Sequence, residues 1–236
     1  MLSKTWLLTR KELVLESRGR DTLPPMAAFA VTVVVLLAFA LPGSARLTAP
    51  VTLPSGTVPL ADVISGFLWV TLLFAGLIGF ARTFEAERAS GALESLLLVP
   101  IDRGGIYAAK ALANLVFIVA AEVLIVPLFI ILFGIDVGGS WVALILVIIL
   151  VDIGFVAAGT LFAALAAATR SRELMLPLLA LPALVPVFIA AVELSSDLFV
   201  GATVSDVAGR GWFGILVAYD IVFTVAGALA FEYALD

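Results

Sequence analysis

The chain has 236 residues, of which 63% are hydrophobic and 13% charged, and its formal net charge is −5. Soluble domains carry about 25% charged residues, so the composition predicts an all-α polytopic integral membrane protein and excludes an ordinary soluble domain. The absence of cysteine and histidine excludes disulfides, thiolate metal sites and histidine ligands for a metal or haem. The acidic balance argues against a nucleic-acid partner, which would need a basic patch.

The first twenty residues predict a helix at the membrane interface. Their apolar side chains lie on one broad helical face, which would rest on the lipid while the other face meets water. These residues are Leu2, Trp6, Leu7, Leu13 and Val14. The same pattern also fits a simple anchor with no further role.

Six segments are long and apolar enough to cross a bilayer, which needs about 20 apolar residues per helix. They comprise residues 23–41, 63–81, 106–134, 141–168, 174–192 and 212–234. The third and fourth exceed the length that a span needs, so tilt or protruding ends are expected. The fifth contains Pro177, Pro182 and Pro186 and is predicted to be kinked or broken. The whole chain, 1–236, is interpreted as a single transmembrane domain.

The basic residues are distributed unevenly between the two sides of these spans. Eleven of the 13 lie before the first span or near the second and fourth loops, whereas only Arg46 and Arg210 lie on the other side. Cytoplasmic segments of membrane proteins are enriched in Lys and Arg, so both termini are predicted to be cytoplasmic, in the plasma (inner) membrane. The proline-rich loop 42–61, on the opposite side, is interpreted as an extended connector.

The loop between the second and third spans holds a charged segment, residues 83–99, with helical periodicity. Glu87, Gly91 and Glu94 share one face of such a helix, and Ala and Leu side chains occupy the opposite face. A helix of this kind lies along the cytoplasmic membrane surface with its acidic face outward, and Gly91 would let another protein surface come close. The alternative is a solvated amphipathic connector with no partner.

The same segment carries a family resemblance. Residues 87–97 (ERASGALESLL), followed by Pro100 and Lys110, resemble the E-x-x-x-G-x-L-E-x-L…P…K signature of type-2 ABC transporter permeases. More narrowly, the chain is similar to the CcmB family, the haem exporter B subunits of cytochrome c maturation. The loop 170–173 (RSRE), the prolines of the fifth span and the six-span layout resemble that family too. Asn114 stands where the family often carries a histidine or an aromatic residue soon after the lysine.

The resemblance implies partners for the chain. Residues 83–99 would be a coupling helix that docks on a separate, CcmA-like ATPase subunit through Glu87, Gly91 and Glu94. The second membrane half would be a CcmC-like subunit or a second copy of this chain, and a small accessory membrane subunit could join them. No P-loop sequence G-x-x-x-x-G-K-[ST] occurs, so ATP would bind to the partner. This chain would bind no cofactor itself, and haem would be handled by the complex.

Two acidic residues, Glu122 and Asp152, lie within the third and fourth spans. If those spans form an antiparallel hairpin, the two carboxyls lie at similar depth, and one of them would be protonated because two close carboxylates rarely both ionise. One interpretation is a shared proton that holds the helices together, and the other is a polar lining or a proton-sensitive contact. Asp62, Glu193, Asp220 and Glu232 are predicted to lie near span ends, where water reaches them.

Two other functions are compatible with the sequence. The first is a generic type-2 ABC exporter permease for lipid, glycan or drug, because many such permeases share the first half of the signature. The second, of another class, is an intramembrane protease that uses Glu122 and Asp152 as its acidic pair, although the motifs that surround such dyads are absent.

Overall fold

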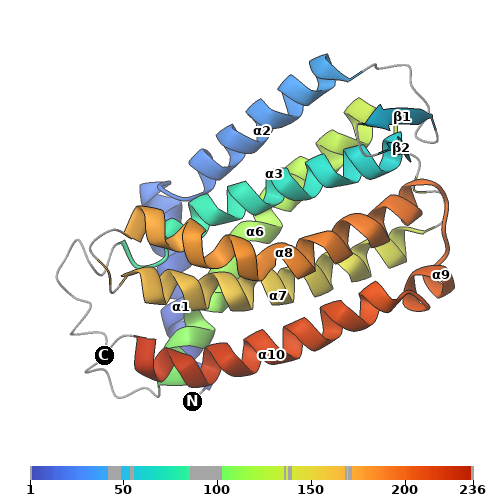
Figure 1. The fold of residues 1–236 in the computed structure, drawn as a ribbon. Helices are drawn as coiled ribbons and strands as arrows, with labels where there is room; N and C mark the ends of the chain where they lie inside the picture. Colours follow the sequence, from blue (N-terminus) through green and yellow to red (C-terminus); the bar gives the residue numbers. More distant parts are fainter. Residues whose placement is uncertain are drawn as a thin grey trace.

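The computed structural model describes residues 2–41, 49–53, 56–85, 103–135, 137, 140–167, 169 and 172–234. In chain order its elements are α1 (Leu2–Gly19), α2 (Leu23–Ala40), β1 (Pro50–Leu53), β2 (Gly56–Pro59), α3 (Leu60–Arg82), α6 (Arg103–Phe133), α7 (Trp141–Ala167), α8 (Arg172–Phe199), α9 (Val204–Ala208) and α10 (Gly211–Ala234). Figure 1 shows both ends of the chain at one end of the helical bundle and the strands at the other. We call these the α1 end and the hairpin end.

Six helices of the described chain are long and apolar enough to cross a membrane, namely α2, α3, α6, α7, α8 and α10. The predicted all-α membrane fold is confirmed, and five of the six spans begin and end within three residues of their predicted bounds. The fifth differs, because α8 runs to Phe199 as one helix through Pro177, Pro182 and Pro186. The prolines do not break α8: membrane helices tolerate proline where neighbouring helices pack around the freed backbone groups, and α8 packs between α3, α7 and α10.

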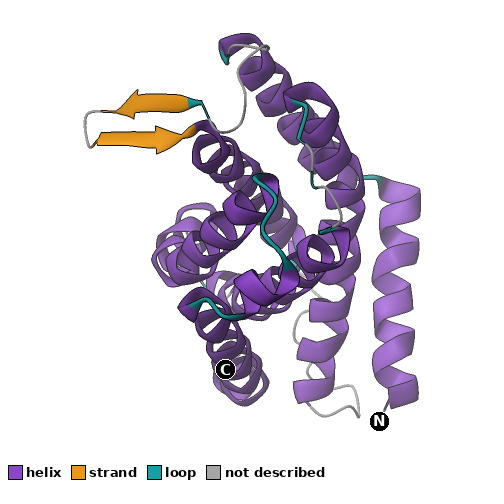
Figure 2. Cartoon of the chain, turned by 90° about the vertical axis from the view of Figure 1, so that its right-hand side faces the viewer, coloured by secondary structure: helices purple, strands orange, loops and turns teal. Residues whose placement is uncertain are grey.

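The loop predicted as an extended connector contains a small antiparallel hairpin. Strands β1 and β2 pair Pro50 with Pro59 and Val51 with Val58, and Figure 2 shows the hairpin projecting sideways from the helices. Proline lacks the N–H group that pairs strands, so it is tolerated only where that donor is not needed, such as the ends of edge strands. These are the only strands in the described part of the chain.

Helix α7 lies at the centre of the bundle because its side chains are small. It packs against α8, α10, α6 and α3, and most of its second half is buried Ala or Gly. Phe80 of α3 occupies the space where Gly159 of α7 would carry a Cβ, and Phe155 of α7 occupies the equivalent space at Gly76 of α3. The two rings meet edge to face, with centroids 5.1 Å apart. These glycines let the two backbones approach closely, as small residues do between membrane helices.

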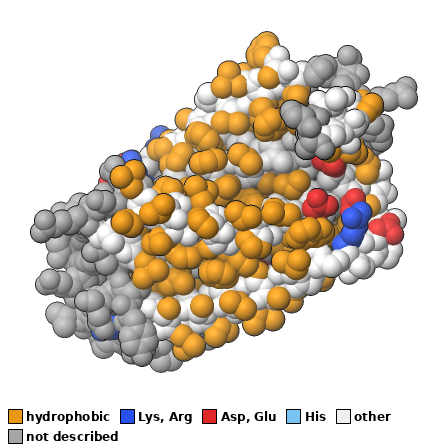
Figure 3. Space-filling view, in the orientation of Figure 1, with side chains coloured by type: hydrophobic (Ala, Val, Ile, Leu, Met, Phe, Trp, Pro, Cys, Tyr) orange, Lys and Arg blue, Asp and Glu red, His pale blue; other side chains and the backbone are white. Residues whose placement is uncertain are grey.

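The outer surface of the bundle is apolar, as expected of a protein in contact with lipid. Phe39 is 88% exposed, Ile131 76% and Val142 71%. Figure 3 shows hydrophobic side chains over the length of the bundle, with charged side chains visible at its two ends. Helix α1 runs across the other helices (Figure 1) and exposes Trp6 and Leu7, so it has the apolar face that an interfacial helix requires.

Candidate functional site

The α1 end of the bundle holds a network of buried polar contacts. It starts on α1, which packs against α6. The Thr9 hydroxyl donates to the Ala109 carbonyl oxygen, 3.2 Å away. Near the end of α1, the carboxylate of Glu16 accepts backbone N–H groups from Thr22 and Leu23 at 2.8–3.0 Å. Since Glu16 satisfies two free donors at the start of α2, it fixes the angle between α1 and α2.

Lys110 of α6 is the centre of this network. Its side chain is almost fully buried, and its Nζ lies 3.0 Å from Glu12 Oε1 on α1. The same Nζ donates to the Thr83 carbonyl oxygen at 2.8 Å, just beyond the last residue of α3, and lies 5.2 Å from the centre of the Phe84 ring. A buried ammonium group is stable only when it is paired and hydrogen-bonded. Lys110 therefore joins α1, α6 and the end of α3.

Asn114 extends these contacts one helical turn further into the bundle. Its side-chain oxygen accepts the Thr83 hydroxyl at 3.2 Å, and its Nδ2 donates to the Thr160 hydroxyl of α7 at 2.9 Å. Asn114 and Thr160 are both buried. The chain of contacts thus runs from α1 through α6 and α3 to α7, the central helix.

A cavity of about 590 Å³ opens beside this network. Both signs of charge line it, in the form of Glu12, Glu16, Arg82, Glu85 and Lys110. Arg82 and Glu85 form an exposed ion pair at 2.6 Å. Glu85 is the last described residue before the loop that joins α3 to α6, so the cavity and the network lie where that loop leaves the bundle.

The predicted docking residues Glu87, Gly91 and Glu94 lie outside the described residues, as does most of the predicted coupling helix 83–99. The structure does describe Lys110, the last residue of the signature. It also describes both ends between which the segment runs, at Arg82 of α3 and Arg103 of α6.

The structure brings Glu122 and Asp152 together in the middle of the bundle. Glu122 of α6 is 5% exposed and Asp152 of α7 is 3% exposed, and their carboxyl groups are close enough to interact with each other. A hydrogen bond between the two carboxyl groups would require a proton on one of them. Asp152 Oδ1 has no hydrogen-bond partner among the described residues. The pair lies between α6 and α7, about two turns deeper in the bundle than Asn114.

Asp220 differs from its prediction. It lies within α10 and is 7% exposed, with its carboxyl packed against Gly154 of α7. The prediction that water reaches it at a span end was wrong, because the absence of a side chain at Gly154 makes room for a carboxyl between α7 and α10.

Comparison with known proteins identifies the chain. The model of the family described as "CcmB protein" matches residues 3–236. The chain belongs to the CcmB family. "Heme exporter protein B" of Rhodobacter capsulatus is 34% identical over 141 residues, 60% of this chain and 64% of that protein. "Heme exporter protein B" of Pseudomonas aeruginosa is 28% identical over 184 residues, 78% of this chain and 76% of that protein.

The sequence pattern singled out only one member of the buried network of this CcmB protein. Lys110 belongs to the signature, and Asn114 was noticed only as a departure from the family pattern. Glu12, Thr83 and Thr160 carried no signal of their own, because each is a common polar residue in an ordinary helical context. A lysine just inside an apolar span was the usable clue, since a buried ammonium must find an acid and an acceptor nearby.

Proposed function

We propose that this chain is the membrane permease subunit of an ABC transporter complex that acts in haem export or handling for cytochrome c maturation. The observation that carries the proposal is the CcmB match over residues 3–236, together with two relatives named "Heme exporter protein B". ATP would be bound and hydrolysed by a separate, CcmA-like subunit. A second membrane subunit, CcmC-like or a second copy, would complete the membrane part, with a small accessory membrane subunit beside them.

In this proposal the α1 end faces the cytoplasm and the protein lies in the inner membrane. The distribution of basic residues supports this orientation. The ATPase subunit would dock on the loop between α3 and α6 through Glu87, Gly91 and Glu94.

The contacts of Lys110 suggest how a displacement of that loop would reach the membrane. The loop leaves α3 at Arg82 and enters α6 at Arg103, and Lys110 ties the end of α3 to α6 and α1. Asn114 adds α7. A push on the loop would therefore move these four helices together, as a rigid group, and not bend one helix alone.

Deletion of the gene in its own host tests the proposed function. The covalently bound haem of c-type cytochromes is measured by haem staining of denaturing gels, and b-type cytochromes, which bind haem without a covalent link, serve as the control. We expect c-type haem to disappear, b-type haem to remain, and the chain supplied in trans to restore the loss. Normal c-type cytochromes together with the loss of an exported lipid or glycan would show a generic exporter instead.

A further inference from the structure

Helix α1 separates its charged side chains by sign. Its basic residues are all exposed, and they are Lys4, Arg10, Lys11 and Arg18. Its two acids face the bundle instead: Glu12 pairs with Lys110 and its side chain is 15% exposed, whereas Glu16 is buried and caps α2. Just beyond the helix, Arg20 and Asp21 are both exposed and cancel in charge. The exposed face of α1 is therefore purely cationic.

Three of these cations form a line along the helix. Lys4, Lys11 and Arg18 follow one another at intervals of seven residues, so each lies within about 20° of the one before and about 10 Å further along the helix axis. Leu7 and Val14 form an apolar stripe beside this line and are 60% and 39% exposed. Such a pattern suits the headgroup region of a bilayer, where apolar side chains enter the acyl chains and long basic side chains reach the phosphates.

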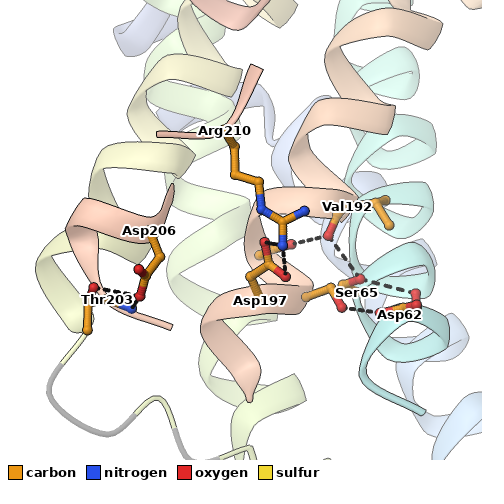
Figure 4. Close-up of polar contacts among 9 residues, drawn as sticks. Asp62, Ser65, Val192, Asp197, Thr203, Asp206 and Arg210 are labelled. Atoms are coloured by element: carbon orange, nitrogen blue, oxygen red, sulfur yellow. Dashed lines mark hydrogen bonds and ion pairs between the residues drawn. The ribbon is translucent and has the colours of Figure 1, made fainter. Parts of the chain in front are cut away.

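The hairpin end of the bundle has the opposite character. In the part of this end that the structure describes, the basic residue is Arg210, which forms an ion pair with Asp197 at 2.7 Å. Figure 4 shows Asp62 and Asp206 in the same region, and both act electrostatically on Asp197. A cation that is paired and surrounded by acids gains little from an anionic surface. An attraction to anionic groups is therefore expected at α1 and not at the hairpin end.

We propose that the exposed face of α1 binds anionic phospholipids, whose phosphate groups pair with Lys4, Lys11 and Arg18. Zwitterionic lipids also carry a phosphate, but their own cationic group neutralises it, so the face selects lipids with a net negative charge. The inference goes beyond the proposed function and shares with it only the placement of the α1 end at the cytoplasmic membrane surface. A Lys or Arg side chain close to an anionic leaflet raises affinity about fivefold.

Lipid fits this face better than a protein partner does. Trp6 and Leu7 are each 60% exposed among the cations, and tryptophan is enriched where membrane proteins meet the headgroups. The opposite side of α1 is tied to α6 through Thr9 and Glu12. Lipid bound to the outer face would thus hold the start of α6 at the level of the headgroups.

Photoreactive lipids test the site in the complete complex. The complex is reconstituted in phosphatidylcholine vesicles that contain a small fraction of phosphatidylglycerol or of phosphatidylcholine, each with the same diazirine-bearing acyl chain. After illumination the adducts are mapped by mass spectrometry. We expect α1 peptides to carry about fivefold or more adduct from phosphatidylglycerol than from phosphatidylcholine, and the peptide around Arg210 to show no preference. Equal labelling of α1 by the two lipids would overturn the proposal, as would a lack of lipid adducts on α1 because a protein covers this face.

Matched variants of the three cations test recognition by charge. The combination of Lys4→Gln, Lys11→Gln and Arg18→Gln should abolish the preference for phosphatidylglycerol, whereas the charge-preserving combination of Lys4→Arg, Lys11→Arg and Arg18→Lys should keep it. Loss in both combinations, or in neither, would contradict the proposal.

Concentrated salt gives the same test on the wild type, without any effect of a substitution on membrane insertion. Salt screens exposed charges, so it should lower the preference of α1 for phosphatidylglycerol, and an unchanged preference would contradict the proposal. The ATPase subunit is quantified in the same preparations. Its absence from the wild-type complex would contradict the proposed function alone, because lipid labelling of α1 does not require it.

Discussion

Replacement of Lys110 by methionine is expected to destabilise the protein more than any other change of a single charge at the α1 end. Lys110 Nζ and Glu12 Oε1 are 3.0 Å apart, and their side chains are 5% and 15% exposed. At an effective dielectric constant of about 20 the Coulomb attraction at this distance is about 5 kcal/mol. Without Lys110, the mostly buried Glu12 keeps only the exposed Lys11 as an ion-pair partner among the described residues, so we expect the free energy of unfolding to fall by about 3–5 kcal/mol.

Lys11 provides a control on the same acid. Its Nζ lies 3.5 Å from the same Glu12 oxygen, but its side chain is 45% exposed. Exposed ion pairs contribute less than about 1 kcal/mol, so Lys11→Met should be nearly neutral. The double variant Lys110→Met with Glu12→Met should be more stable than Lys110→Met alone, because it no longer places the Glu12 carboxylate in a mostly buried site without the lysine of α6.

Reversible unfolding in mixed detergent micelles, followed by circular dichroism, measures these differences. The single and double variants form a double-mutant cycle that isolates the pairing of Lys110 with Glu12. Equal stabilities of Lys110→Met and Lys11→Met, or additive effects in the cycle, would refute the reasoning that the buried pair holds α1 on α6.

Three further predictions follow from the structure. Glu122→Gln with Asp152→Asn should retain assembly and activity, because amide groups can form a hydrogen bond in place of the predicted shared proton. Complete loss of activity in a normally assembled complex would instead indicate a functional polar lining. Gly159→Leu should lower the free energy of unfolding by about 1–3 kcal/mol, because the new side chain overpacks against Phe80. The control Gly214→Ala should not destabilise the protein, because a Cβ at that position meets nothing within 4 Å. Equal effects of the two variants in thermal unfolding would contradict the close packing of Gly159 against Phe80. Hydrogen bonds from the Thr203 side chain and backbone lower the pKa of Asp206. The ionised carboxylate therefore stabilises the fold at pH values above the ordinary carboxyl pKa, and this stabilisation is lost as the pH falls through the lowered pKa. The difference in stability between the wild type and Asp206→Asn should shrink on acidification.

The spans could be predicted from sequence because burial in lipid and burial in protein both demand apolar side chains. That demand ends at the polar tail of α8, where the prediction was wrong. Ser195, Ser196 and Asp197 lie beyond the predicted end of the span. They still belong to α8, because Trp69 and Asp62 of α3 bind the two serines and Arg210 binds Asp197. The two pairings between α3 and α8 join residues more than a hundred positions apart, and helical periodicity carries no information about them.

Only some residues of the candidate site could be predicted from the sequence. Glu122 and Asp152 could be paired because an antiparallel hairpin sets their depth from the turn alone. Lys110 could be noticed because a lysine in an apolar span is unusual, but its partner on α1 depends on how α1 crosses the bundle. Nothing local to Glu12 fixes that crossing, since it depends on the Thr9 contact and on the cap that Glu16 forms at α2.

Co-purification of the ATPase subunit with variants of the loop between α3 and α6 tests the central claim most directly. Both Gly91→Trp and the double variant Glu87→Lys with Glu94→Lys should insert normally, yet lose the ATPase subunit and the formation of c-type cytochromes. Arg88→Ala, about 100° round the predicted helix from Glu87, is the control and should retain both. Recovery of a fully coupled ATPase with the Gly91 and double-glutamate variants would contradict the account and reduce the segment to a connector.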